Sequence, residues 1–248
     1  MHVSPLIAAA VGALSITAAH AGSGTVYVDA ASNIYAAGSA DTSAFEQGGI
    51  LPLSIDIAGS TEVQFTAVGV GPAVDGSPTG GATCVFNGTP STGDGANCVN
   101  SSTNVSAANG YGSFVLNGRT MPLVGLFLGS TVEATPTGVN SSFDAENAQT
   151  SFAPLLQQVF FIGDGLSDLG ALQTFAVPTG ATKLYLGFAD AFGFSGAPGY
   201  FSDNHGGLSV SYVTTPVPEP ASVALGLAGL LLVLGPLRAR KPAQVPQA

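Results

Sequence analysis

Two carboxylates and one amide flank a glycine-rich loop late in this 248-residue chain. Asp190 ends an apolar stretch, and Asp203 and Asn204 stand shortly before the next one. Calcium prefers hard oxygen ligands, which carboxylates, amide oxygens, loop carbonyls and water all supply. The pattern therefore predicts a calcium site. One alternative stays open, because Asp and Asn at strand ends also satisfy the backbone of ordinary turns.

Residues 175–213 resemble the C-terminal strands of small calcium-dependent bacterial lectins that bind galactose. In those lectins a strand-end Asp and an adjacent Asn-Asn pair hold the ion, together with one loop carbonyl. A run of Gly, a hydrophobic residue, Ser and Val follows the pair, as it does at residues 207–210 here. The resemblance implies the following calcium ligands: Asp190, the carbonyl of Tyr200, Asp203 and Asn204.

The chain departs from the lectin pattern in two ways. Asp203 stands where the lectins have the first Asn, and the extra carboxylate should strengthen ion binding. The loop is also several residues longer, and it carries aromatic residues that can cover the ion where a sugar would bind: Phe192, Phe194, Tyr200 and Phe201. Calcium therefore transfers from the resemblance better than galactose does.

The C-terminal part of the chain reads as a rigid spacer, a membrane segment and a cytoplasmic stop. Pro218, Glu219 and Pro220 precede an uncharged apolar run over residues 221–237, which as a helix would be about 25 Å long, just enough to span a bilayer. Arg238, Arg240 and Lys241 follow, and such a basic end is expected in the cytoplasm. Everything before this segment is therefore expected outside.

This ending is similar to the sorting signal of bacterial PEP-CTERM proteins. The match rests on Val217-Pro218-Glu219-Pro220, the apolar helix and the basic end, which together cover residues 216–241 and leave a short tail at 242–248. The resemblance implies that exosortase, a membrane-embedded protease, cuts near the motif and sends the protein to the cell surface or its exopolysaccharide. A permanent single-span anchor with a proline-rich stalk has the same topology.

The N-terminus predicts a signal peptide over residues 1–21. Residues 6–16 are apolar, and Ala19-His20-Ala21 has the small-x-small pattern of a cleavage site. The segment before the apolar stretch lacks Lys and Arg, which departs from the usual signal, so a plain apolar helix is the alternative. The predicted ectodomain then covers residues 22–215, enough for one domain.

The charge of the ectodomain limits its partners. Between residues 22 and 217 the chain has 2 basic and 14 acidic residues, because Glu219 is the only one of 15 outside it, and the net charge is 2 − 14 = −12. Such a surface repels nucleic acid and anionic lipid, since both are recognised by Lys and Arg. Cations are the natural partners, although the charge also serves solubility.

Cys84 and Cys98 lie in a polar stretch between residues 71 and 112, which we expect to be a long surface loop. An exported protein meets oxidising conditions, so the two cysteines are predicted to form a disulfide. Because no His lies nearby in the sequence, a metal site or a catalytic thiol is a poor alternative. Long loops of this kind are often functional.

Apolar residues in the ectodomain alternate with period two, which predicts an all-β fold with few helices. Alternation occurs at residues 51–57, 63–67 and 208–212, while 123–128, 159–162 and 184–188 are continuously apolar and are expected in the centre of a two-layer core. These features favour a β-sandwich with jelly-roll topology. Residues 140–158 predict one or two short helical turns, with Ser142 or Asp144 as a helix start.

The sequence favours a non-catalytic protein. After processing His205 is the sole histidine, and no nucleotide or zinc motif occurs. Glu133 with Asp144 or Glu146 could form a glycosidase pair, but sequence does not bring them together. We therefore expect an exported surface or extracellular matrix protein that binds surface polysaccharide or a galactose-like sugar through calcium. The alternative is a structural or adhesive matrix protein without sugar binding.

Overall fold

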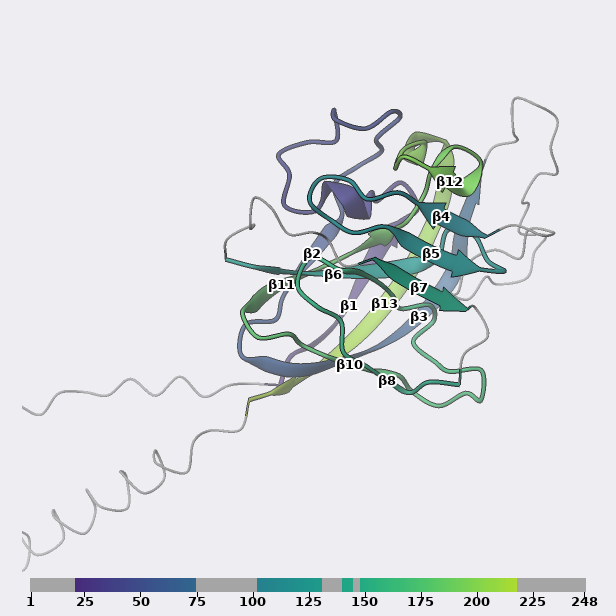
Figure 1. Ribbon diagram of the computed structural model, residues 1–248. Coiled ribbons are helices and arrows are strands. Elements are labelled where there is room, and N and C mark those ends of the chain that lie inside the picture. The colour runs from purple at the N-terminus through teal and green to yellow at the C-terminus, as the bar shows by residue number, and fades with distance from the viewer. Residues whose placement is uncertain (1–20, 75–101, 131–139, 145–147, 218–248) are drawn as a thin grey trace, which may run out of the picture. The chain divides into compact units, whose positions relative to one another are not determined.

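Thirteen strands and three short 3-10 turns make up the part of the chain that the computed structural model describes, residues 21–74, 102–130, 140–144 and 148–217 (Figure 1). The 3-10 turns are η1 (Ile34–Ala36), η2 (Phe192–Phe194) and η3 (Phe201–Asp203). The prediction of an all-β fold with few helices is confirmed for these residues. Residues 1–20, both cysteines, Glu133, Glu146 and everything after Val217 lie outside the description.

Two antiparallel sheets form the body of the domain. The first has the order β1-β13-β3-β10-β8, with β1 at Ser23–Asp29, β13 at Asn204–Pro216, β3 at Ser60–Val74, β10 at Thr174–Ala176 and β8 at Ser151–Phe152. The second has the order β2-β11-β6-β9, with β2 at Leu53–Asp56, β11 at Ala181–Phe188, β6 at Leu123–Gly129 and β9 at Val159–Phe161. Every pairing in both sheets is antiparallel except that of β8 with β10.

A third, smaller sheet covers the outer face of the second one. Its order is β12-β4-β5-β7, with β12 at Ser195–Gly196, β4 at Thr103–Val105, β5 at Phe114–Asn117 and β7 at Ser141–Asp144. Strand β7 lies where helical turns were expected, so that prediction is wrong. Tertiary packing explains the difference: β7 pairs in parallel with β5, and the Phe143 ring packs 5.9 Å from Phe114 and 6.0 Å from Phe161.

The second sheet therefore lies between two apolar cores, which corrects the expected two-layer arrangement. Alternate side chains of β6 enter opposite cores, because successive residues of a strand point to opposite faces. Leu123 and Phe127 pack with the first sheet, while Val124, Leu126 and Leu128 pack toward the third. This explains why β6 is apolar at nearly every position.

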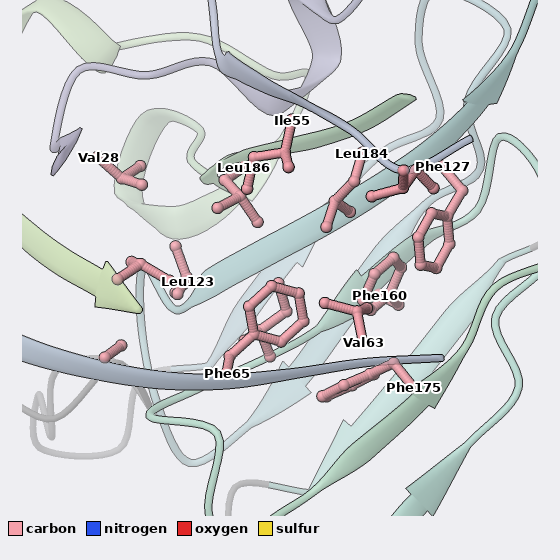
Figure 2. Close-up of a cluster of buried hydrophobic side chains, with 14 of the residues drawn as sticks. Val28, Ile55, Val63, Phe65, Leu123, Phe127, Phe160, Phe175, Leu184 and Leu186 are labelled. Atoms are coloured by element: carbon pink, nitrogen blue, oxygen red, sulfur yellow. The ribbon is translucent and has the colours of Figure 1, made fainter. Parts of the chain in front are cut away.

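The core between the first two sheets is rich in aromatic rings. Figure 2 shows Phe65, Phe127, Phe160 and Phe175 pointing into one space with aliphatic side chains around them. The rings of Phe127 and Phe160 stack with centroids 5.0 Å apart, and Phe175 meets Phe65 edge-on at 5.5 Å. Gly125 makes room for this cluster, since a Cβ there would lie 2.5 Å from the Phe160 ring.

Strand β13 runs between two regions for which the sequence predicts a function. It begins at Asn204, where the predicted calcium ligands lie, and ends at Pro216, just before the predicted sorting motif. Its last residues pair with the start of β1, Val213 opposite Ser23. At about 3.3 Å per residue, the two ends of β13 are roughly 40 Å apart.

Candidate functional site

Asp190 lies two residues after β11, at the end of the second sheet, and its side chain is buried, with 1% of its surface exposed. Its Oδ1 accepts a hydrogen bond from the Ala191 N–H at 2.8 Å. Its Oδ2 accepts one from Nδ2 of Asn204 at 2.9 Å. Because Asn204 begins β13 in the first sheet, this bond joins the two sheets at one end of the domain.

The Asn204 side chain is buried and only half satisfied. Its Nδ2 donates to Asp190 and, at 3.4 Å, to the Ala30 carbonyl. Its Oδ1 is buried and has no hydrogen-bond partner among the described residues. A buried acceptor without a donor costs about 1–3 kcal/mol, so a partner such as a cation or a water is expected beside it.

Asp203 adds a second carboxylate next to this buried pair. It is half-buried at the end of η3, and its negative charge contributes to a raised pKa of Asp190. Burial is the largest cause of that shift, which takes the pKa of Asp190 to about 7, against the lowering effect of the Asn204 and Ala191 hydrogen bonds. Such a carboxyl group carries its full charge at neutral pH only if a cation compensates it.

Tyr200 lies in the same loop, with a left-handed backbone at φ 66° that non-glycine residues rarely adopt. Its N–H donates to the Glu46 carbonyl at 2.8 Å, and its hydroxyl lies 2.9 Å from Oε1 of Glu46. The Glu46 hydrogen bond is the largest cause of a raised pKa of Tyr200, followed by slight burial and by the charges of Glu46 and Asp203. The hydrogen bond to Glu46 therefore fixes the position of the Tyr200 side chain.

A second loop, residues 38–50, supports the first through its backbone. Glu46 forms a parallel bridge with Gly199, and the Ser202 N–H donates to the Gln47 carbonyl at 3.1 Å. The contact is close, since a Cβ on Gly199 would lie 2.8 Å from the Glu46 carbonyl oxygen. Sequence reasoning missed Glu46, because it lies 154 residues from Tyr200 and no motif marks it.

The aromatic residues of the longer loop differ in exposure. Phe201 is fully buried, and the expected covering of the ion by these residues stays a prediction. Phe192 is 55% exposed, and its ring centroid lies 5.0 Å from that of Tyr200. Phe201 is buried because the backbone of the 38–50 loop passes close to it: a Cβ on Gly49 would lie 2.5 Å from the Phe201 Cβ. Phe192 and Tyr200 thus form an aromatic pair at the loop surface.

The arrangement brings Asp190 and Asn204 into direct contact, with Asp203 nearby and Tyr200 in the adjoining turn. Among the described residues, no group of three or more His, Cys, Asp and Glu side chains has the geometry to hold a metal. A calcium ion here would therefore need amide, carbonyl and water oxygens besides the two carboxylates. His205 is exposed, and Asp164 accepts from the Leu166 N–H at 2.8 Å, as a turn residue does.

The remaining predicted site residues lie at the end of the described part of the chain or outside it. Val217 is the last described residue, and its N–H donates to the Gly59 carbonyl at 2.8 Å. Pro218, Glu219 and Pro220 of the predicted motif, and Cys84 and Cys98, lie outside it. Across residues 21–74, 102–130, 140–144 and 148–217 no helix has the length and apolarity to cross a membrane; residues 221–237 lie outside that search.

The chain was compared with protein-family models, with curated proteins and with solved structures, and none of the three comparisons gave a match.

Proposed function

We propose that this is an exported, non-catalytic protein of the cell surface or exopolysaccharide matrix whose β domain binds one calcium ion and surface carbohydrate. The calcium ligands are Asp190, Asp203, the Asn204 amide oxygen and the Tyr200 carbonyl. The observation that carries the proposal is the buried Oδ1 of Asn204, which lacks a hydrogen-bond partner among the described residues and lies beside a buried carboxylate. An ion at this point would satisfy the amide and compensate both carboxylates.

We infer that the domain is a jelly-roll β-sandwich. Its main strands pair in a nested way: β1 with β13, β2 with β11, β3 with β10 and β6 with β9. Such nesting describes one long antiparallel ribbon folded back on itself. Contacts of β13 with β3 and of β11 with β6 then close the rolled ribbon into two sheets. Lectin domains are among the proteins that use this fold.

Export and sorting complete the proposal. Residues 1–21 would be removed as a signal peptide, and exosortase would process the PEP-CTERM signal that begins at Val217, Pro218, Glu219 and Pro220. A disulfide between Cys84 and Cys98 would form outside the cell. Strand β13 separates the candidate site from Pro216, the residue before the motif, by roughly 40 Å. Mass spectrometry of surface material with an intact 238–248 tail would contradict exosortase processing.

A structural or adhesive matrix protein remains the alternative. Its support is that both oxygens of Asp190 already accept hydrogen bonds, from Ala191 and Asn204. A carboxylate so placed can simply fix the turn after β11, as many buried Asp residues do. In that case calcium would have no effect on the folded state.

Thermal unfolding of the exported protein in millimolar calcium and in chelator tests the proposal. An ion that binds only the folded state adds about 2.7 kcal/mol at a hundredfold excess over its Kd. Asp190→Asn should remove most of this gain. Asp56→Asn is the matched control, because Asp56 is exposed and bonded to Lys183 at 3.3 Å on another part of the domain. Equal melting in calcium and chelator would overturn the calcium site.

A further inference from the structure

We propose that the surface formed by Phe192, Tyr200 and Glu46 binds a polysaccharide that carries free amino groups. This inference deepens the carbohydrate part of the proposed function and rests on it. It assigns a ligand class to a surface beside the calcium site, which shares only Tyr200 with it: the carbonyl of Tyr200 is the proposed calcium ligand, and its side chain belongs to the surface.

The first observation is an aromatic surface that is both exposed and fixed in place. Phe192 is 55% exposed, and its ring lies 5.0 Å from that of the half-exposed Tyr200. Glu46 holds Tyr200 through its backbone carbonyl and its carboxylate. Tyrosine is enriched at binding interfaces, because its ring is apolar and its hydroxyl is polar. The apolar face of a sugar ring is a partner of suitable shape.

Backbone geometry shows that the loop is built to hold this surface. Phe194 and Tyr200 both have positive φ, at 63° and 66°, although neither is a glycine. Strain of this kind persists only where surrounding contacts impose it. At Tyr200 those contacts come from the 38–50 loop, where the Gln47 carbonyl accepts from the Ser202 N–H and the Glu46 carbonyl accepts from that of Tyr200, whereas the Phe194 N–H donates to Ala191 within its own loop.

The second observation is charge. Glu46 lies at the hydroxyl end of Tyr200, and Asp203 is close enough for its charge to act on the same phenol. The 38–50 and 191–203 segments contain no Lys or Arg. An ammonium group is therefore favoured twice, by the carboxylates and by the aromatic faces, which attract cations within about 6 Å. Anionic polysaccharides are disfavoured by the same charges.

An amino sugar combines both requirements in one unit. Its ring can stack on Phe192 while its ammonium group reaches the Glu46 carboxylate at the edge of Tyr200. A neutral sugar uses only the aromatic surface, and a free metal ion uses only the carboxylates. A polymer of amino sugars also presents many copies of the ligand, which raises its retention by a matrix protein through avidity.

A matched pair of oligosaccharides tests the inference: glucosamine oligomers, which carry free amines, and N-acetylglucosamine oligomers of the same length, which do not. Binding to the exported protein is measured by calorimetry in millimolar calcium at mildly acidic pH, where the amines are charged. We expect the free-amine oligomers to bind about tenfold more tightly, because a cation–π contact or a charge pair is worth on the order of 1–2 kcal/mol.

Variants assign the binding to residues. Phe192→Leu should weaken binding of the amine oligomers about tenfold, and Glu46→Gln should weaken it and reduce its salt dependence, with the calcium-dependent stabilisation retained in both. Tyr27→Leu is the control, because Tyr27 on β1 is 60% exposed but lies outside this surface. Unchanged binding in Phe192→Leu would overturn the assignment.

The outcomes separate this inference from the proposed function. Equal binding of both oligomers, or binding of neither while calcium still stabilises the protein, would overturn the amino-polysaccharide ligand and leave the calcium site standing. If calcium did not stabilise the protein but amine-dependent binding remained, the calcium site would be overturned and the amino-polysaccharide ligand would stand.

Discussion

Each end of β13 carries a buried polar side chain, but the two side chains differ in how fully they are hydrogen-bonded. At the C-terminal end Thr214 is buried, and its N–H donates to the Gly22 carbonyl at 2.7 Å while its hydroxyl accepts from the Gly22 N–H at 2.9 Å. At the N-terminal end Asn204 is equally buried, but its Oδ1 has no hydrogen-bond partner among the described residues. The bonds of Thr214 with Gly22 form a closed clamp, whereas the Asn204 acceptor is unsatisfied in the described part of the chain.

The two ends of β13 also differ in the charges that surround the buried side chain. No carboxylate takes part in the Thr214 clamp, whereas Asn204 touches Asp190 and lies next to Asp203. Polar groups buried for stability alone are normally satisfied, because each unmet group costs free energy. Under the proposed function, the Asn204 end serves binding and the Thr214 end serves folding. The following predictions test that division.

The largest expected effect is a pH dependence that belongs to the Asn204 end. In chelator the folded state keeps a proton on Asp190 up to a pKa of about 7, against an ordinary value of 3.8. The folded state thus binds more protons than the unfolded one in this window, so the free energy of unfolding falls as pH rises from about 4 to about 7. Integrated, the loss is roughly 4 kcal/mol. Chemical denaturation across this pH range measures it.

Two comparisons check the origin of that slope. Asp190→Asn should flatten the profile in chelator, whatever its effect on overall stability. Calcium should also flatten it, because an ion stabilises the charged carboxylate and lowers its pKa. Asp41 and Asp56 have lowered pKa values, so their contributions fall below pH 4 and do not interfere. A slope that persists in Asp190→Asn would contradict the assignment.

The sequence predicted several strands and the proximity of Asp190 and Asn204, but it predicted neither the third sheet nor the contact of Glu46 with Tyr200. Period-two alternation located β2, β3 and β13, because burial on one face leaves a local pattern that a single strand carries. The strand-end positions of Asp190 and Asn204 predicted their proximity, since both residues flank one loop, although β11 and β13 lie in different sheets. Local patterns could not predict the third sheet or the role of Glu46, because both depend on contacts between segments far apart in the chain, such as Glu46 with Tyr200. The burial of Phe201 likewise depends on how two loops cross.

A pair of glycine substitutions should produce the next largest effect. A Cβ at Gly199 would lie 2.8 Å from the Glu46 carbonyl oxygen, so Gly199→Ala must push the two loops apart. We expect a loss of about 1–3 kcal/mol, as for other overpacked sites, and a reduced calcium response. Thermal unfolding with and without calcium measures both.

Gly59 provides the matched control at the other end of β13, where its carbonyl accepts from Val217. It has φ +78°, and a Cβ added there would have no atom within 4 Å, so Gly59→Ala is strained only by its backbone. We expect a loss of about 1–2 kcal/mol with the calcium response unchanged. If both variants lost the calcium response equally, the two ends would not be independent.

The smallest expected effect comes from Thr214→Val, which keeps the shape of the side chain and removes its hydroxyl. The hydroxyl bonds to both the N–H and the carbonyl of Gly22, at 2.9 and 3.2 Å. Gly22 is half-exposed, so water can replace part of what is lost, and we expect a cost of about 1 kcal/mol. That cost should be the same in calcium and in chelator and the same at pH 5 and pH 8, because no ionised side chain belongs to the clamp. Equilibrium unfolding under these four conditions measures it. A cost that changed with calcium would mean that β13 transmits the state of one end to the other, and the division between a binding end and a folding end would fail.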